Sequence, residues 1–259
     1  MRLDIYLVNK QCCESRNKAA SLIADGNISV NDLIIRKPSY DVKESDIVKI
    51  KDDIKVYVAR SAKKLLTAYE RFSLSFNGKT AVDLGASTGG FCQVMLDNGI
   101  KKIYAVDIGS NQLHDSIRSD KRVISMENTN ARNITPAMFN DVIDIITCDL
   151  SFISLTHILP AVYDTLRPMG EFICLVKPQF EVGPSNIGKN GVVKSLKLRK
   201  SAVCKVTDLA YTLGFEVRDV CFSELEGESG NREYLVYMRK NRAEKPFSHE
   251  IIENRINEI

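Results

Sequence analysis

The apolar positions of the first 56 residues follow short helical and strand-like patterns. Residues 2–8 place apolar side chains one helical repeat apart, which predicts a short helix. Ser15 stands where an N-cap belongs ahead of a second helix, Arg16–Ala24, and Gly26 would end that helix in a left-handed conformation. Short strands are predicted at residues 28–30, 33–35 and 47–50. This part of the chain therefore reads as a module of two helices and a small sheet.

From residue 57 onward, apolar segments of strand length alternate with amphipathic segments of helical period. Strands are predicted at residues 80–84, 102–107, 143–148, 171–176, 216–223 and 233–239. Helices are predicted at residues 61–72, 90–98, 154–166 and 194–213. Such alternation implies a mostly parallel sheet with helices on both faces. The last two strands are joined by a link too short for a crossover helix, so they are expected to pair antiparallel at one edge.

The predicted fold class is therefore α/β, a Rossmann-like sheet that follows a small α+β unit. We expect a first domain over residues 1–56, a linker over residues 57–61 and a second domain over residues 62–259. The tail, residues 247–259, is amphipathic enough for a short helix, and its mixed charges favour packing on the protein over insertion into a membrane.

Composition narrows the class of protein. A chain of 259 residues suffices for two modest domains, and a hydrophobic content of 44% allows a sizeable core. The net charge of +3 does not identify a nucleic-acid-binding protein by itself. Seven cysteines without a C-x-x-C spacing, and three scattered histidines, argue against a disulfide framework or a metal site. Because neither a signal peptide nor an apolar run of roughly 18 residues is visible, a cytoplasmic location is expected.

A glycine-rich turn follows the predicted strand at residues 80–84. The segment Ala81–Gly90 reads Ala-Val-Asp-Leu-Gly-Ala-Ser-Thr-Gly-Gly, and Asp107 ends the next predicted strand about 20 residues beyond the turn. Glycines let the backbone approach a ligand closely, and a carboxylate at this distance can accept hydrogen bonds from a ribose diol. The alternative is an ordinary tight turn between a strand and a helix.

The spacing of this turn departs from G-x-G-x-x-G and resembles the first motif of S-adenosylmethionine-dependent methyltransferases. In those enzymes the turn holds the methionine part of the cofactor. The resemblance implies S-adenosylmethionine as the cofactor, and nicotinamide dinucleotides are not expected to bind. The candidate cofactor-binding residues are Asp83, Gly85, Ser87, Gly89, Gly90, Phe91, Asp107, Ile108 and Asp149.

Titratable residues stand at the ends of several predicted strands. Asp149 and Lys177 each follow a strand, and Glu233 stands at the start of the last one. Lys64 lies on the helix that precedes the glycine-rich turn. A single acid or lysine at a strand end is more often merely solvated. Because the carboxyl ends of parallel strands meet at one edge of a sheet, the set is expected to converge on one crevice.

These four residues resemble the Lys-Asp-Lys-Glu tetrad of the FtsJ-like ribose 2′-O-methyltransferases. The segments Arg60–Leu65, Lys177–Glu181 and Gly230–Tyr234 also match. Together with residues 1–50 they resemble the TlyA, or haemolysin A, family, in which an S4 RNA-binding domain is fused to a ribosomal RNA methyltransferase. The S4 pattern is matched at Arg2-Leu-Asp4, Ser15-Arg16, Ala19, Gly26, Val30-Asn31 and Lys37-Pro-Ser39. Ala59, Ser61 and Glu224 depart from residues frequent in the family, which bears on substrate fit rather than on the tetrad.

The resemblance implies 2′-O-methylation of cytidine in large-subunit ribosomal RNA, with small-subunit RNA as a second candidate substrate. A ribose 2′-hydroxyl must lose its proton as it attacks a methyl group, and a neutral lysine can accept that proton. Two neighbouring lysines disfavour double protonation, so one of them can be held neutral. We expect Lys177 to be the base and Lys64 to position the ribose. Asp149 and Glu233 would orient the two lysines, without a metal.

Basic residues suggest where RNA binds. The segment 182–207 contains lysines and arginines but no acids, and it follows the Lys177 strand, which favours a phosphate-contacting flap over a merely solvated helix face. The candidate RNA-binding residues are Arg2, Arg16, Lys18, Arg36, Lys37, Arg60, Lys189 and Lys194. The expected partner is ribosomal RNA within ribosomal subunits, with neither a membrane nor an obligate protein partner. Two alternatives stay open, a membrane-active haemolysin and a non-catalytic assembly factor that binds ribosomal RNA.

Overall fold

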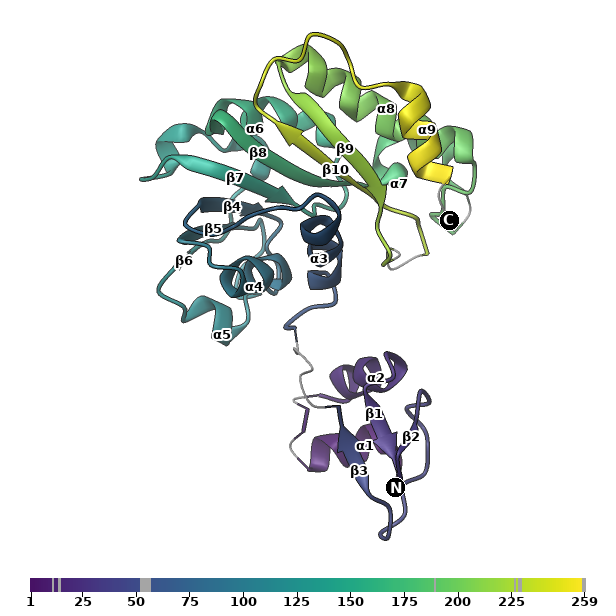
Figure 1. Ribbon diagram of the computed structural model, residues 1–259. Helices are drawn as coiled ribbons and strands as arrows, with labels where there is room; N and C mark the ends of the chain where they lie inside the picture. Colours follow the sequence, from purple (N-terminus) through teal and green to yellow (C-terminus); the bar gives the residue numbers. More distant parts are fainter. Residues whose placement is uncertain are drawn as a thin grey trace. The chain divides into compact units, whose positions relative to one another are not determined.

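The computed structural model describes residues 1–10, 12–13, 15–51, 57–188, 190–225, 227 and 230–257. The chain divides into two compact units, Met1–Val56 and Tyr57–Ile259 (Figure 1). Tyr57 and Val58, which belong to the segment expected to be a linker, pack against the core of the second unit.

The first unit packs two helices against a three-stranded antiparallel sheet. Its elements are α1 (Leu3–Asn9), α2 (Arg16–Ala24), β1 (Ile28–Val30), β2 (Leu33–Ile34) and β3 (Val48–Ile50), with the strands in the order β2-β1-β3. The predicted ends of α2 are confirmed, because the Ser15 side chain accepts a hydrogen bond from Lys18 N and Gly26 has φ +75°. Leu3, Leu7 and Ile23 are fully buried between the layers.

The second unit is built on a seven-stranded sheet. Its strands are β4 (Thr80–Leu84), β5 (Lys102–Val106), β6 (Val123–Met126), β7 (Ile143–Cys148), β8 (Leu166–Val176), β9 (Glu216–Phe222) and β10 (Tyr234–Arg239). The strand order is β6-β5-β4-β7-β8-β10-β9, and β10 runs in the opposite direction to the other six strands. The predicted mostly parallel sheet and the antiparallel pairing of the last two strands are both confirmed. The antiparallel strand lies one position in from the edge, because β10 returns into the space between β8 and β9.

Helices cover both faces of this sheet (Figure 1). The helices α3 (Ala62–Arg71), α4 (Gly90–Asp97) and α5 (Asp115–Arg118) contribute to one apolar cluster. The helices α6 (Leu159–Thr165), α8 (Leu196–Leu213) and α9 (His249–Asn257) contribute to the other. A short helix, α7 (Pro178–Glu181), follows β8, and 3-10 turns occupy residues 131–133, 136–138, 155–157 and 184–186. The amphipathic tail packs as expected, since Ile252 and Ile256 of α9 are buried.

Several elements of the second unit differ from the sequence-based expectation, and the short helices α5 and α7 are two that were not predicted. The predicted helix over residues 154–166 is a 3-10 turn followed by α6, whose first turn contains Pro160. The strand β8 begins at Leu166 rather than near residue 171, because Leu166 pairs with Ile143 of β7 across a register shift. The edge strand β6 was not predicted, since it is partly exposed and has no continuous apolar run.

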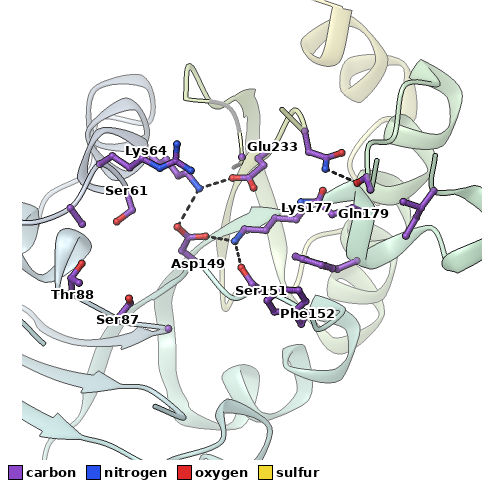
Figure 2. A pocket seen from close by; sticks show the side chains of 18 residues that line it. Ser61, Lys64, Ser87, Thr88, Asp149, Ser151, Phe152, Lys177, Gln179 and Glu233 are labelled. Carbon is purple, nitrogen blue, oxygen red and sulfur yellow. Dashed lines mark hydrogen bonds and ion pairs between the residues drawn. The ribbon is translucent and has the colours of Figure 1, made fainter. Parts of the chain in front are cut away.

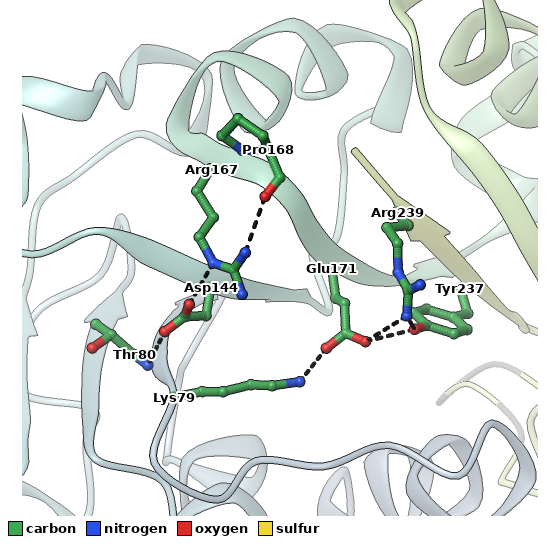
Figure 3. A network of polar contacts seen from close by, with 8 residues as sticks. All are labelled: Lys79, Thr80, Asp144, Arg167, Pro168, Glu171, Tyr237 and Arg239. Atoms are coloured by element: carbon green, nitrogen blue, oxygen red, sulfur yellow. Dashed lines mark hydrogen bonds and ion pairs between the residues drawn. The ribbon is translucent and has the colours of Figure 1, made fainter. Parts of the chain in front are cut away.

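A network of polar contacts lies at the amino-terminal edge of the parallel strands, which is the edge opposite their carboxyl ends (Figure 3). Glu171 accepts a hydrogen bond from Tyr237 Oη at 2.6 Å and forms ion pairs with Lys79 and Arg239. Burial alone would raise the pKa of Glu171, but the hydrogen bonds from Lys79 and Tyr237 outweigh it and leave the pKa lowered. Three segments of the second unit, the start of β4, β8 and β10, are thereby tied together at that edge.

Candidate active site

The four titratable residues singled out in the sequence form one connected chain of contacts (Figure 2). Lys64 Nζ donates to Glu233 Oε2 at 2.6 Å and to Asp149 Oδ2 at 3.4 Å. Lys177 Nζ lies 2.7 Å from the other oxygen of the same carboxylate, Asp149 Oδ1. Each of the four side chains is at most 13% exposed. Asp149 therefore bridges two lysines in a largely buried cluster.

The sheet explains why residues so distant in sequence meet. Asp149 follows the last residue of β7 and Lys177 follows the last residue of β8, so both lie at the carboxyl edge of the parallel strands. Because β10 runs antiparallel, its first residue, Tyr234, pairs with Val176 at the end of β8. Glu233 immediately precedes Tyr234 and consequently reaches the same edge.

The two lysines have different partners. Lys64 contacts two carboxylates, whereas Lys177 contacts one carboxylate and donates to the neutral hydroxyl of Ser151 at 2.9 Å. The cluster thus pairs two lysines with two carboxylates. Removal of one partner from such a buried cluster leaves an uncompensated charge and costs about 3–5 kcal/mol. The cluster is therefore held together as a unit.

Two cavities open beside the cluster. The larger has a volume of about 600 Å³, and the tetrad residues are part of its lining. The second has a volume of about 410 Å³ and is lined by Asp107 and Ile108, whose side chain is largely exposed. Both cavities share Gly85, Ser151 and Phe152. A ligand with a polar and an apolar part can therefore reach from the carboxylate of Asp107 toward the tetrad.

The glycine-rich turn after β4 lies in close contact with the ends of β5 and β7. Gly85 has φ +82°, and a Cβ added there would lie 2.9 Å from the carbonyl oxygen of Asp149. Asp107 accepts hydrogen bonds from the backbone N–H groups of Ser87 at 2.8 Å and Gly109 at 2.7 Å. The turn is thereby fixed between the ends of β5 and β7. A small concave wall with a carboxylate at its rim fits the ribose and the methionine part of an adenosine-bearing cofactor.

Four predicted cofactor-binding residues do not line either cavity: Asp83, Gly89, Gly90 and Phe91. Asp83 is buried under the turn, where it accepts hydrogen bonds from Thr147 Oγ1 and Cys92 Sγ, and burial raises the pKa of Asp83 to about 6. Gly89 is the N-cap of α4 and has φ +94°, and Phe91 belongs to the apolar core. A Cβ on Gly90 would lie 2.5 Å from Ser61 Oγ, so this glycine permits close packing of α4 on the start of α3.

In the first unit, two of the predicted RNA-binding arginines share one acid. Arg2 donates to both oxygens of Asp4, at 3.0 and 2.9 Å, and Arg16 donates to Asp4 Oδ2 at 3.2 Å. The hydrogen bond from Arg2 is the largest effect on the pKa of Asp4; with Arg16 it outweighs the opposing effect of burial and lowers the pKa to about 2. Arg36 donates to the carbonyl oxygen of Ala24 at the end of α2, and Lys18 and Lys37 lie elsewhere on the unit.

In the second unit, Arg60 is exposed and lines the larger cavity, and Lys194 is exposed just before α8. Lys189 falls outside the described residues. Two other lysines of the basic segment already have acidic partners, since Lys200 pairs with Glu253 and Lys205 pairs with Glu181. Part of the positive charge of the segment 182–207 is therefore paired with acidic residues of the same protein.

Three residues of the site were not predicted. Asn231 is buried, and its amide accepts from Val193 N at 2.9 Å and donates to Gly191 O at 2.8 Å, which fixes the basic segment beside the cavity. Buried Glu181 accepts from Leu155 N and Ser154 Oγ and so holds the loop after β7. Ser151 contacts Lys177. The only signal in the sequence was their place within, or next to, the matching motifs.

Within the described ranges of the chain, no helix is both long and apolar enough to cross a membrane. Within the same ranges, no group of three or more histidine, cysteine, aspartate or glutamate side chains is arranged to hold a metal ion.

Comparison with known proteins identifies two matching families. Residues 57–240 match the model of the FtsJ-like methyltransferases, and residues 1–48 match that of the S4 domain. The chain is 40% identical over 239 residues to a protein of Mycobacterium tuberculosis named 16S/23S rRNA (cytidine-2′-O)-methyltransferase TlyA, covering 92% of this chain and 89% of that one. It is 37% identical to Hemolysin A of Brachyspira hyodysenteriae, covering 92% and 99% of the two chains.

A solved structure of a hemolysin-named protein from Streptococcus thermophilus has the same fold. It is 36% identical to this chain and superimposes with a TM-score of 0.77, covering 99% of this chain and 94% of that one. The similarity therefore extends over both units rather than over the sheet alone.

Proposed function

Because the chain belongs to the TlyA family of FtsJ-like methyltransferases that carry an S4 domain, we propose that it methylates the 2′-hydroxyl of a ribose in ribosomal RNA. The observation that carries the proposal is the contact chain Glu233–Lys64–Asp149–Lys177 beside a cavity of about 600 Å³. The name of the M. tuberculosis relative supports cytidine as the nucleotide and ribosomal RNA of either subunit as the substrate.

S-adenosylmethionine is the proposed cofactor. Gly85 and Ser87 would lie against its methionine part, and Asp107 and Ile108 would hold its ribose and adenine. This assignment is supported by the crowding around Gly85, where a Cβ would fill the space next to Asp149 O. When bound, the cofactor supplies a methyl group on a positively charged sulfur.

The tetrad of Lys64, Asp149, Lys177 and Glu233 would remove the proton of the ribose hydroxyl. Lys177 is the proposed acceptor, because its Nζ contacts one carboxylate and a neutral hydroxyl, whereas Lys64 Nζ contacts two carboxylates. Lys64, held by Glu233 and Asp149, would position the ribose oxygen. Asp149 would orient both lysines through its two oxygens. General-base catalysis of this kind contributes roughly 10²–10⁴-fold to a rate.

The first unit would bind the RNA without taking part in the chemistry. Arg2 and Arg16, held by Asp4, present two guanidinium groups that suit phosphate oxygens. In the second unit, Arg60 and Lys194 would contact RNA around the cavity. A substrate within ribosomal subunits implies that the protein works in the cytoplasm.

Methyl transfer from labelled S-adenosylmethionine to unmethylated ribosomal subunits tests the proposal, with Lys177→Ala and Lys177→Arg as variants. Both should bind the cofactor normally and lose about 10²–10⁴-fold in single-turnover rate at saturating cofactor. Arginine should fail nearly as badly as alanine, because a guanidinium stays protonated. Near-normal transfer by the arginine variant would reassign the base to Lys64. A wild-type protein that binds subunits without transferring methyl groups would instead be an assembly factor, and leakage of lipid vesicles would support the haemolysin.

A further inference from the structure

The nitrogen of Lys177 has a partner outside the tetrad. Nζ donates to Ser151 Oγ at 2.9 Å, while Asp149 Oδ1 lies 2.7 Å away on another side (Figure 2). Ser151 lies in the loop after β7 and lines both cavities. We propose that Ser151 is a positioning residue that aims Lys177 Nζ at the ribose hydroxyl, an inference that rests on the proposed methyl-transfer function.

An amine nitrogen offers only a few directions for its partners. Lys177 Nζ is tetrahedral, with three positions beyond its carbon, and an oxygen acceptor can face a position only if that position holds an N–H. Ser151 accepts one N–H, which fixes the rotation of the group about its bond to carbon, whereas Asp149 Oδ1 lies 2.7 Å from Nζ as an ion pair without hydrogen-bond geometry. The negative charge of Asp149 favours an N–H on its own side, which leaves the position toward the cavity for the lone pair of the neutral amine. Without Ser151, no hydrogen bond among the described residues fixes that rotation, and the lone pair has no set direction.

The same contacts serve both protonation states. As the ribose 2′ oxygen forms its bond to the methyl carbon, the carbon–sulfur bond breaks with its electron pair going to sulfur, and the hydroxyl proton passes to the lone pair of Lys177 Nζ. The resulting ammonium still donates to Ser151 and pairs with Asp149, and its new N–H faces the methylated oxygen. No contact of Lys177 has to change while the proton moves.

Among the described residues, Lys64 has no equivalent hydroxyl. Its nitrogen contacts two carboxylates, Glu233 Oε2 at 2.6 Å and Asp149 Oδ2 at 3.4 Å. Lys177 therefore differs from Lys64 in having a neutral partner, Ser151. A neutral acceptor orients an amine without placing a negative charge beside it. This difference supports a directional role for Ser151 at Lys177.

The loop that carries Ser151 is held in place. Glu181 accepts hydrogen bonds from Leu155 N at 2.7 Å and from Ser154 Oγ. Phe152 has φ +65°, a left-handed conformation that is unfavourable for a residue with a Cβ and persists only where neighbouring contacts determine it. The Ser151 hydroxyl is thus presented from a fixed backbone rather than from a loose one.

The test compares Ser151→Ala, which removes the hydroxyl, with Ser151→Thr, which keeps it. Thr212→Ala, which removes an exposed hydroxyl on α8, is the matched control. Single-turnover methyl transfer to unmethylated ribosomal subunits is measured at saturating S-adenosylmethionine, and cofactor affinity is measured by calorimetry. Ser151→Ala should transfer roughly 10- to 100-fold more slowly, as expected for a lost hydrogen bond to a charged group, with the KM for subunits and the cofactor Kd within about twofold of wild type. Ser151→Thr should recover to within about threefold, and Thr212→Ala should match wild type.

Three results would overturn the inference: a normal rate in Ser151→Ala, an equal loss in both Ser151 variants, or a weaker cofactor Kd with a normal rate at saturation. The last would make Ser151 a cofactor contact. None of these touches the proposed function as long as the wild-type protein methylates the subunits and Lys177→Ala does not. Absence of transfer by the wild-type protein would instead refute the function on which the inference rests.

Discussion

Replacing Asp107 by alanine is expected to weaken cofactor binding through the ribose. Each oxygen of this carboxylate accepts one backbone N–H, from Ser87 at 2.8 Å and from Gly109 at 2.7 Å. A carboxylate has about four lone-pair sites, so two remain for the hydroxyls of a ribose in the cavity that Asp107 lines. The Asp107 side chain therefore forms part of the cavity wall and faces the expected position of the ribose.

The size of the effect follows from these contacts. One or two charge-assisted hydrogen bonds to the ribose are worth about 1.5–3 kcal/mol each, so their loss should raise the Kd of S-adenosylmethionine by roughly tenfold to 10⁴-fold. The alanine variant also frees the Ser87 and Gly109 amides, which loosens the turn and adds to the loss. Affinity alone cannot separate the two contributions.

A ligand-side cycle separates them. S-adenosylhomocysteine and its 2′-deoxy analogue are titrated calorimetrically into the wild-type protein and into Asp107→Ala, with Asp164→Ala as the control for an exposed carboxylate on α6. If Asp107 bonds the diol, loss of the hydroxyl should weaken binding to the wild type and to the control but hardly to Asp107→Ala. An equal penalty in all three proteins would refute the ribose contact and leave Asp107 with a role in loop structure only.

Two further predictions concern charge. Asp4→Asn should weaken binding to a ribosomal RNA fragment even though it removes a negative charge, because Arg2 and Arg16 lose their shared acceptor. Asp32→Asn removes the same charge elsewhere in the first unit and is the control. Tighter binding by Asp4→Asn would contradict the role of the arginine pair. Glu171→Gln should lower the free energy of unfolding at pH 7 by about 1–3 kcal/mol. The pKa of Glu171 is lower in the folded than in the unfolded state, so its stabilisation is present above the unfolded-state pKa and is lost as pH falls through the folded-state pKa. Urea unfolding should therefore show the difference in stability between wild type and Glu171→Gln shrinking below about pH 4. A difference that stays constant with pH would refute this role of Glu171.

The central strands could be predicted because both of their faces are buried. β4 and β7 are apolar at most positions and buried along nearly their whole length, and their predicted bounds agree with the structure. The edge strand β6 is only four residues long and partly exposed, so its sequence carries a weaker signal. Pairing order was accessible only in part, because the insertion of β10 between β8 and β9 depends on how the α8 crossover packs rather than on any local pattern.

The tetrad could be located because each member stands at a strand end or on an adjoining helix, and topology alone brings those positions together. Ser151 and Asn231 could not be located in this way. Their contacts join Lys177 and Val193 to loops 26 and 38 residues away, and a serine or asparagine in a loop has no periodicity that marks its partner. Such residues become visible only when the direction of each side chain is known.

The glycine-rich turn was interpreted as a cofactor loop, and the structure gives its glycines a second consequence. Gly85 admits the carbonyl of Asp149 where a Cβ would lie only 2.9 Å away, and Gly90 admits Ser61 at the start of the helix that carries Lys64. The turn therefore sets the separation of β4 from the end of β7 and of α4 from α3. Because Lys64 and Asp149 are 3.4 Å apart at their closest charged atoms, a shift of either neighbour by a few tenths of an ångström would alter that contact. The motif proposed to accommodate the methyl donor thus also determines the geometry of the residues proposed to act on the acceptor.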